Sequence, residues 1–297
     1  QDIEASSVQA LGDGTLRGGE FEQTVVDWLE EGHTFVLLGH PGSGKTFFLR
    51  WLALSVVGRE SFGEVARPFP LLASLAAYAE APGPLTLYDH LVETLLEAGQ
   101  PAAHALAGQV AAGHAVFLLD GLDEVGDESA RARVVVAVEA LRERAPGCMI
   151  VATSRIAGYD ASVLPHALHL MLSPFDDGAI RGFLLRWCEQ YALDRAEDSP
   201  RAGLEGQEEG EQLARDVLAH KDVRELARNP LMLTVLAIVH RTGVRLPDHR
   251  VELYDHATRV LVERWNRVRS LTSQRPPPPL KTADAVRLLG PVALEMV

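Results

Sequence analysis

The segment Gly39–Thr46 constrains the fold more than any other part of this chain. It reads Gly-His-Pro-Gly-Ser-Gly-Lys-Thr, which fits the pattern G-x-x-x-x-G-K-[ST], and it lies between an apolar run at 33–38 and a helix-forming run at 47–53. A strand, a glycine-rich loop and a helix in this order form a phosphate-binding P-loop. The sequence therefore predicts an α/β domain whose parallel sheet carries a phosphate site.

Each residue type in this loop has a physical role. Gly42 and Gly44 let the backbone adopt positive φ, so that successive N–H groups point into one concavity at the positive end of the following helix. Lys45 is one of only three lysines in the chain, against 25 arginines. It is expected to bridge the β- and γ-phosphates of a nucleotide, while the Thr46 hydroxyl is offered to Mg²⁺. The expected nucleotide-binding residues of the loop are Gly39, Pro41, Gly42, Ser43, Gly44, Lys45 and Thr46.

Composition indicates a globular protein of a reducing compartment. The chain has 297 residues, of which 47% are hydrophobic, and can form one large domain or two to three smaller ones. Cys148 and Cys188 lie in apolar surroundings, as free buried thiols do. The sequence has no signal-peptide pattern and no apolar run long enough to span a bilayer. We therefore expect a cytoplasmic protein without a membrane partner, and we expect this chain, which begins at Gln1, to be a piece of a longer one.

The charge of the chain argues against nucleic acid as its main partner. A net charge of −13 is unfavourable for a surface that must neutralise phosphates. Four arginines recur on one expected helix, and a solvated helix face is the favoured interpretation for Arg259, Arg264, Arg267 and Arg269. Direct nucleic-acid binding is not expected.

Apolar runs alternate with helical patterns as far as about residue 175. After the loop, strands are expected at 68–75, 115–120, 148–153 and 167–172, one or two helices within 85–112, and a helix at 128–143. Strands that are apolar throughout belong to a parallel sheet with helices on both faces. A short helix is also expected at 21–29, after a polar, glycine-rich linker at 1–20.

Beyond residue 175 the periodicity becomes helical. Apolar residues share a helix face within 180–188 and again within 253–265, whereas the acidic, glycine-rich segment 194–211 is predicted to be a surface loop. Four prolines at 276–279 indicate a stiff linker. We therefore divide the chain into a linker (1–20), a nucleotide-binding domain (21–175), an all-α domain (176–274) and a proline-rich linker with the start of a further region (275–297).

The second strong signal is the run Phe-Leu-Leu-Asp-Gly-Leu-Asp-Glu at 117–124. An acid at the end of a buried strand is costly unless it meets a cation, so Asp120 is expected to hold Mg²⁺ together with Thr46. Asp123 and Glu124 are placed to orient or deprotonate an attacking water, with a slight preference for Glu124. The alternative is a solvent-facing acidic turn.

The third signal is Thr153-Ser154-Arg155, which closes the next strand. The carboxyl ends of strands line the ligand crevice of an open α/β sheet, so these polar groups could reach the γ-phosphate and report its presence. Arg155 is expected to act in this way; the alternative is a surface arginine. The guanine-selecting pattern [NT]-K-x-D is absent, which favours ATP over GTP.

Together these motifs resemble the NACHT group of STAND NTPases. The resemblance spans about residues 20–290 and rests on the P-loop, on the paired acids after Asp120, on Thr153–Arg155 and on Ala-Arg-Asn-Pro-Leu-Met-Leu-Thr at 227–234. The segments Leu246-Pro247 and Glu252-Leu253-Tyr254, with Trp265, are also similar to bacterial NACHT proteins.

The resemblance implies a particular arrangement. The strand of Thr153 would lie between the P-loop strand and the strand of Asp120, which would bring Arg155 beside the γ-phosphate. The helices from 176 onward would form a lid on the nucleotide, with Pro230 near the adenine or its ribose. The alternative for Pro230 is an ordinary helix-start proline after the cap Asn229. A winged-helix-type region would begin near Lys281 and be cut short.

The resemblance also implies a function. A NACHT switch binds ATP or ADP with Mg²⁺, hydrolyses ATP slowly, and controls self-association and effector activation; its bacterial relatives defend against phage. The effector and sensor regions would lie outside this chain, and the trigger would come from phage. The alternatives are a nucleic-acid-stimulated ATPase of the P-loop/AAA type and an idle nucleotide-binding scaffold.

Overall fold

The computed structural model describes residues 8–10, 15–16, 33–57, 61–62, 65–66, 68–97, 103–157, 159, 163–195, 201–241 and 287. The chain divides into two compact units, Gln1–Pro174 (unit 1) and Phe175–Val297 (unit 2), and each is described by itself. The helix expected at 21–29, the arginines between 259 and 269, the segments at 246–265 and the prolines at 276–279 lie outside the described residues. Beyond Lys281, only Arg287 is described.

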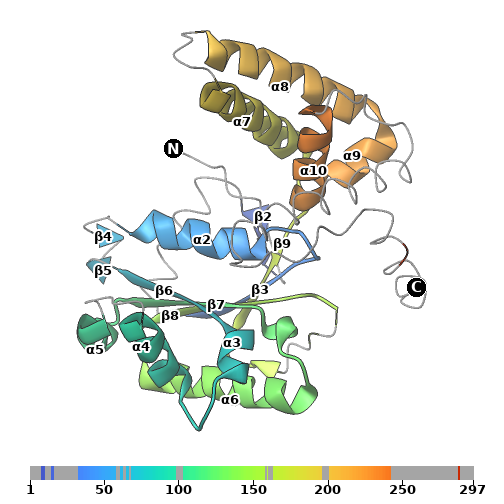
Figure 1. The fold of residues 1–297 in the computed structure, drawn as a ribbon. Coiled ribbons are helices and arrows are strands. Elements are labelled where there is room, and N and C mark those ends of the chain that lie inside the picture. The colour runs from blue at the N-terminus through green and yellow to red at the C-terminus, as the bar shows by residue number, and fades with distance from the viewer. Residues whose placement is uncertain are drawn as a thin grey trace. The chain divides into compact units, whose positions relative to one another are not determined.

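Unit 1 contains a sheet with the strand order β2-β1-β9-β3-β8-β7-β6 (Figure 1). Five of these strands are mutually parallel, namely β3 (Thr34–Leu38), β6 (Phe69–Ser74), β7 (Ala115–Asp120), β8 (Met149–Ser154) and β9 (Leu168–Leu172). The predicted parallel sheet is confirmed, including the position of the Thr153 strand between the P-loop strand and the Asp120 strand.

Two short strands extend the sheet beyond β9. Strand β1 (Val8–Ala10) pairs antiparallel with β9, and β2 (Thr15–Leu16) pairs antiparallel with β1. The composition of 1–20 predicts a linker, and these strands are a difference from that prediction. Strands of two or three residues have weak sequence signals, because they are too short to show a pattern and their pairing is decided by the strand edge beside them. A separate hairpin consists of β4 (Ser61–Phe62) and β5 (Val65–Ala66).

Helices cover both faces of the sheet. Helix α2 (Lys45–Val56) lies on one face; α3 (Leu75–Glu80), α4 (Leu87–Glu97), α5 (Ala103–Ala111) and α6 (Glu128–Arg144) lie on the other (Figure 1). Alternate residues of β3 divide between the two cores: Phe35 and Leu37 pack with α2, and Val36 and Leu38 pack with the other helices. Because both sets are buried, the strand is apolar throughout, which is why its sequence does not alternate.

Unit 2 is all-helical. It contains α7 (Asp177–Arg195), α8 (Ala202–Ala219), α9 (Lys221–Ala227) and α10 (Pro230–Arg241), packed around one apolar cluster (Figure 1). The predicted loop at 194–211 is wrong, because α7 continues to Arg195 and α8 occupies 202–211.

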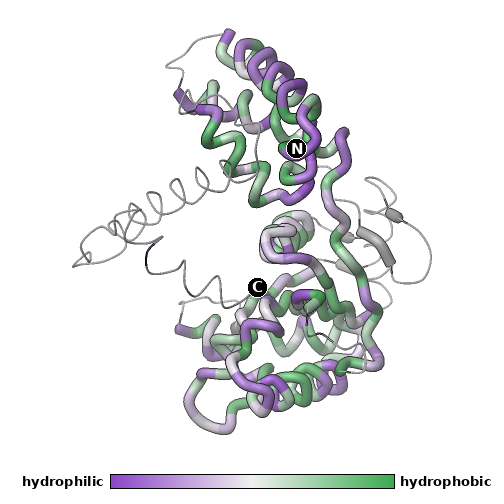
Figure 2. Tube along the Cα trace, turned by 90° about the vertical axis from the view of Figure 1, so that its right-hand side faces the viewer, coloured by the Kyte–Doolittle hydropathy of each residue, from purple (hydrophilic) through white to green (hydrophobic). Residues whose placement is uncertain are grey.

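Glycines at buried positions account for the weak apolar pattern of α8. Figure 2 shows much of α8 as hydrophilic, and two of its buried positions are Gly206 and Gly210. A Cβ on Gly206 would lie 2.7 Å from the carbonyl oxygen of Cys188, and one on Gly210 would lie 2.7 Å from the Cα of Leu185. The two glycines therefore allow the backbones of α7 and α8 to approach closely instead of breaking the helix.

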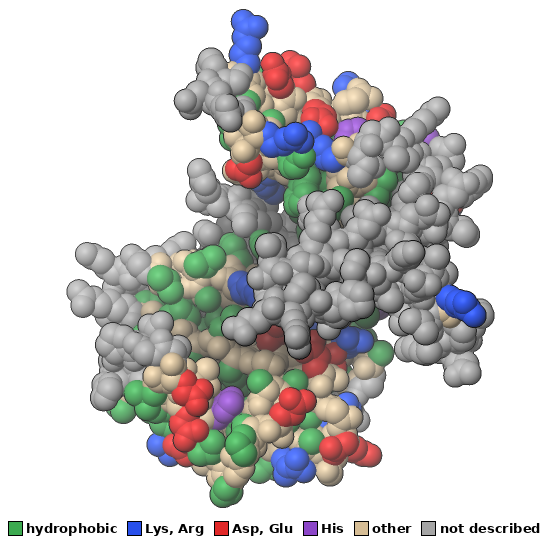
Figure 3. Space-filling view, in the orientation of Figure 1, with side chains coloured by type: hydrophobic (Ala, Val, Ile, Leu, Met, Phe, Trp, Pro, Cys, Tyr) green, Lys and Arg blue, Asp and Glu red, His purple; other side chains and the backbone are tan. Residues whose placement is uncertain are grey.

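Charged side chains are scattered among uncharged ones on the described parts of both units in the face that Figure 3 shows. Acidic and basic groups are interspersed over the visible faces in Figure 3, and on unit 2 several of them pair across helices, such as Arg181 with Glu211 (2.7 Å). Among the described residues, no helix is both long and apolar enough to cross a membrane.

Candidate nucleotide-binding site

The loop between β3 and α2 has the geometry that its glycines predict. Gly42 and Gly44 have φ values of 73° and 96°, in the left-handed region. Gly39 is buried, and a Cβ there would meet Ser43 Oγ, so a larger residue would require the Ser43 side chain to move. The backbone N–H of Ser43 donates to the carbonyl of His40 (3.1 Å), which closes the turn. The exposed members of the loop include Pro41 and Thr46.

The start of α2 is available to an anion. Gly44 is the N-cap and offers no side-chain acceptor, and the first turn of α2 carries no acid. The first N–H groups of a helix lack intrahelical partners, and the helix dipole adds positive potential at this end. Ser43 Oγ is also buried without a hydrogen-bond partner among the described residues. These donors fit a phosphate group in the loop.

The Lys45 side chain folds back along the loop. Its Nζ donates to the carbonyl oxygens of Gly39 (2.8 Å) and His40 (3.3 Å). Burial lowers the pKa of the Lys45 ammonium below its ordinary value, and the Arg155 charge acts in the same direction. Three carboxylates oppose that lowering; in decreasing order of effect they are Asp123, Asp120 and Glu124. The electrostatic neighbours of Lys45 are therefore the residues that the sequence predicts for the site.

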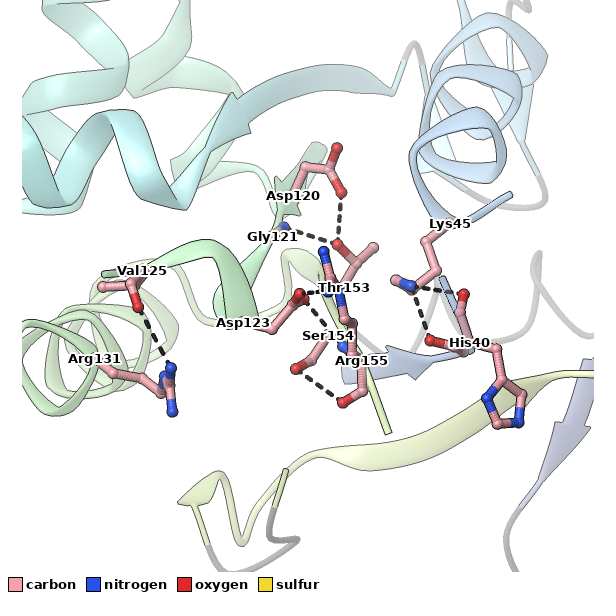
Figure 4. A network of polar contacts seen from close by, with 11 residues as sticks. His40, Lys45, Asp120, Gly121, Asp123, Val125, Arg131, Thr153, Ser154 and Arg155 are labelled. Atoms are coloured by element: carbon pink, nitrogen blue, oxygen red, sulfur yellow. Dashed lines mark hydrogen bonds and ion pairs between the residues drawn. The ribbon is translucent and has the colours of Figure 1, made fainter. Parts of the chain in front are cut away.

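Thr153 connects the ends of β7 and β8 (Figure 4). Its hydroxyl donates to Asp120 Oδ1 (2.6 Å) and accepts from the backbone N–H of Gly121 (2.8 Å). The side chain is fully buried, and its hydroxyl has one donor hydrogen, which the contact with Asp120 uses. Thr153 thus holds the expected Mg²⁺ ligand, a role that the sequence did not predict. The available signal was a polar residue at the end of an otherwise apolar strand.

Asp123 and Arg155 form an ion pair beside this group. Asp123 lies on the 3₁₀ helix η1 (Leu122–Glu124), and Arg155 follows β8. The Arg155 backbone N–H donates to Asp123 Oδ1 (3.0 Å), and Arg155 Nε lies 2.8 Å from Asp123 Oδ2 (Figure 4). Both oxygens of this carboxylate are therefore engaged.

Glu124 has different surroundings from Asp123. Its side chain is exposed, and its carboxylate makes no hydrogen bond or ion pair with another described residue. Gly121 has a φ of 81°, and a Cβ there would lie 2.8 Å from Glu124 Oε2. Gly121 therefore both permits the turn after β7 and leaves room for the Glu124 side chain.

Comparison with known proteins decides the family of a chain with these features. Residues 33–191 match the NACHT domain family. The chain belongs to the NACHT family. The NACHT match begins just before β3, ends within α7, and contains every residue of the P-loop, the acidic turn and the Thr153–Arg155 segment.

Two solved structures are similar to this NACHT chain at low identity. One is the structure of C. elegans PCH-2, with 14% identity, 83% of this chain and 70% of that chain covered, and a TM-score of 0.45. The other is the Aeropyrum pernix ORC1 protein in complex with DNA, with 15% identity, 92% and 75% covered, and a TM-score of 0.43. No curated protein matches the sequence.

The oxygen donors of the NACHT site suit Mg²⁺. Thr46 lies in the first turn of α2 and is exposed, and Asp120 ends β7 partly buried. Among the described residues, no group of three or more His, Cys, Asp or Glu side chains could hold a metal by itself. One hydroxyl and one carboxylate are enough for Mg²⁺, which keeps several waters and takes further ligands from phosphates.

Pro230 is the first residue of α10 in unit 2. The Asn229 Oδ1 before it accepts hydrogen bonds from the backbone N–H groups of Leu231 (3.0 Å) and Met232 (3.2 Å). Asn229 is therefore an N-cap, and Pro230 is at the position where its missing N–H costs least. The helix-start interpretation is confirmed; contact of Pro230 with a nucleotide stays a prediction.

Proposed function

We propose that this NACHT domain binds ATP and ADP with Mg²⁺, hydrolyses ATP slowly, and uses its nucleotide state as a switch. The observation that carries the proposal is the P-loop geometry: Gly42 and Gly44 have positive φ, the N-terminus of α2 has no side-chain cap, and the Lys45 side chain folds along the loop. The residues that end or follow β7 and β8, namely Asp120, Asp123, Glu124 and Arg155, act electrostatically on the Lys45 ammonium. A loop with one cation, free backbone donors and nearby acids is suited to a phosphate–metal pair.

The residues of the site take separate roles in this proposal. The loop 39–46 holds the phosphates through Lys45 and through those backbone N–H groups that are not used within the fold, and Thr46 and Asp120 hold Mg²⁺, which neutralises phosphate charge when it is bound. Glu124 orients the attacking water and accepts its proton, because its carboxylate is open to solvent. Arg155 contacts the γ-phosphate and so distinguishes ATP from ADP.

The switch itself extends to the helical unit. We infer that residues 176–274 form a lid domain, with Pro230 close to the base, and that residues 275–297 begin the next region. Nucleotide then biases the lid between two positions, which controls self-association and the activation of an effector outside this chain. Family membership supports this inference. We further propose a role in antiphage immunity with a phage-derived trigger, on the basis of the resemblance to bacterial NACHT proteins.

Nucleotide retention and turnover test the proposal. Lys45→Ala should abolish retention of ATP and ADP, and Lys221→Ala, which removes an exposed lysine from α9, is the matched control. Glu124→Ala should leave binding intact and slow hydrolysis by about 10²-fold or more, as loss of a general base does. Wild-type ATP affinity in the Lys45 variant would contradict the site.

The same turnover assay separates the alternatives. Strong stimulation by DNA or RNA would favour a nucleic-acid-dependent ATPase over a switch. Tight binding without any hydrolysis by the wild-type protein would indicate a nucleotide-binding scaffold.

A further inference from the structure

The three acids of the turn after β7 have different partners. Asp120 accepts from Thr153, Asp123 is engaged by Arg155 through both of its oxygens, and the Glu124 carboxylate is free of such contacts among the described residues. From the sequence, Asp123 and Glu124 are both candidates for activating water, with a slight preference for Glu124. Their contacts differ, because two of the about four lone-pair sites of the Asp123 carboxylate already hold N–H donors, whereas the Glu124 carboxylate has no such contact with another described residue.

The ion pair with Asp123 does not engage the terminal nitrogens of the Arg155 guanidinium. Asp123 takes the Nε–H and the backbone N–H, so the two terminal nitrogens of the guanidinium remain, and neither makes a hydrogen bond or ion pair with another described residue. A guanidinium has five N–H donors in a rigid fork, so four of them are still available. The exposed fraction of the Arg155 side chain is 52%, against 15% for Asp123. Asp123 therefore holds the guanidinium at Nε, and the two terminal nitrogens remain available to a ligand.

Arg155 directly follows a strand that is paired with the P-loop strand. Leu38 of β3 lies opposite Ser154 of β8, and the Gly39 N–H at the start of the loop donates to the Ser154 carbonyl oxygen (3.3 Å). Asp123 and Arg155 also both act electrostatically on the Lys45 ammonium. Figure 4 shows Lys45 extending toward the side of the loop on which the Thr153–Arg155 segment lies. A phosphate held by Lys45 would be an anion next to these four donors.

We propose that Asp123 is a positioning residue that fixes Arg155 with its terminal N–H groups directed to the γ-phosphate, and is not the base that activates water. The inference rests on the proposed nucleotide site. Asp123 orients Arg155 through two contacts, one with the backbone that fixes where the side chain begins and one with Nε that fixes the plane of the guanidinium. Arg155 then contributes to ATP affinity and not to ADP affinity, because only ATP has a γ-phosphate.

The test is the ratio of ATP to ADP affinity in Asp123→Asn. An Asn side chain is nearly isosteric and has one oxygen left for the Arg155 backbone N–H, but it loses the charge and the second acceptor. The expected result is a threefold to tenfold fall in the ratio (~3–10), with ADP affinity unchanged, which is the scale of one partly exposed ion pair plus a charge-assisted hydrogen bond. In an Arg155→Gln background, Asp123→Asn should have no further effect on the ratio.

A matched control comes from another ion pair of the same unit. Arg142 Nε and Glu139 Oε2 are 2.9 Å apart on α6, and Glu139→Gln breaks that pair without changing the P-loop. The ratio should be unaffected in this variant. ADP affinity and urea unfolding check that each variant is folded.

Three outcomes would overturn the inference. The ratio could stay at the wild-type value in Asp123→Asn, or it could fall equally with Arg155→Gln already present. Alternatively, kcat could fall by about 10²-fold or more at an unchanged ratio, which would make Asp123 the base. If the wild-type protein binds neither ATP nor ADP, the proposed function fails instead, and that result is seen before any variant is made.

Discussion

Gly206 and Gly210 of α8 offer a substitution whose sign can be worked out from the structure. Replacing either glycine with alanine adds one methyl group in the middle of a helix. At an open helical position this change is favourable, because alanine loses less backbone entropy on folding, and the gain is about 0.5–1 kcal/mol. At these two positions the added carbon points at the neighbouring helix α7.

The cost follows from the distances. A Cβ on Gly206 would be 2.7 Å from both the Cys188 oxygen and the Glu189 Cα, and a Cβ on Gly210 would be 2.7 Å from the Leu185 Cα. These atoms are backbone, so relief requires α7 and α8 to move apart, and overpacking of this kind costs about 1–3 kcal/mol. After subtracting the helix-propensity gain, we expect each variant to be less stable than wild type by up to about 2.5 kcal/mol, with a central value of roughly 1 kcal/mol.

Gly203 is the control within the same helix. The nearest atoms to its added Cβ would be 3.8 Å away, at Glu189 Oε1 and Leu193 Cδ2, which is ordinary van der Waals contact. Gly203→Ala should therefore raise stability by up to about 1 kcal/mol, opposite in sign to Gly206→Ala. Urea unfolding followed by circular dichroism gives the three free energies, and hydrogen exchange of α7 and α8 peptides assigns them to unit 2.

Two outcomes of the stability measurements would refute this prediction. If Gly206→Ala and Gly203→Ala stabilise the protein alike, the two helices are not in backbone contact at Gly206. If neither changes stability, the segment is a surface loop, as its composition alone suggests.

Two further predictions concern unit 1. Thr153→Val removes the hydroxyl that contacts Asp120 and Gly121, leaving a buried N–H unpaired, so it should cost about 1–3 kcal/mol in urea unfolding and weaken Mg²⁺-dependent nucleotide binding. Thr153→Ser keeps the hydroxyl and should retain Mg²⁺-dependent binding; equal loss of this binding in both variants would contradict the role given to the hydroxyl. Hydrogen bonds from Ser129 and from the Ala130 N–H lower the pKa of Asp127, the N-cap of α6, below its ordinary value of 3.8. A carboxyl whose pKa is lowered on folding stabilises the folded state at pH values above its unfolded-state pKa, and this stabilisation is lost as the pH falls through its folded-state pKa. The advantage of wild type over Asp127→Asn should therefore be present at about pH 6 and smaller at about pH 3. A difference in urea midpoint that does not depend on pH would refute this assignment.

The strands were predictable because burial on both faces leaves a simple sequence pattern. β7 was expected at 115–120 and is found there, since every residue from Ala115 to Leu119 is buried and apolar. β3 follows the same rule, with Phe35 and Val36 in different cores. A run that is apolar at every position needs no periodicity to be recognised, and its polar neighbours mark its ends.

α8 was not predictable on the same grounds. An amphipathic helix is recognised by large apolar residues at helical spacing, whereas the face of α8 that meets α7 has Ala202, Gly206 and Gly210 in successive turns. Glycine in a sequence usually signals a turn, and only the partner helix shows that it serves close packing. The short helix α3 is not predictable either, because its six residues contain too few helical turns to show an apolar periodicity.

Which charged residues pair in the site depends on the order of the strands in the sheet. The spacing of residues along the sequence does not reveal that order. β8 lies between β3 and β7, and Leu119 is paired with Ala152, so the next residues, Asp120 and Thr153, meet where both strands end. The chains then turn away from the sheet, and the next side chains that can meet are Asp123 and Arg155. This register assigns one partner to each of the first two acids and leaves Glu124 exposed. The slight preference for Glu124 as the water-activating acid thus acquires a physical reason, and we expect the kinetic effects of the two acids to separate: Glu124 in the rate of hydrolysis and Asp123 in the discrimination of ATP from ADP.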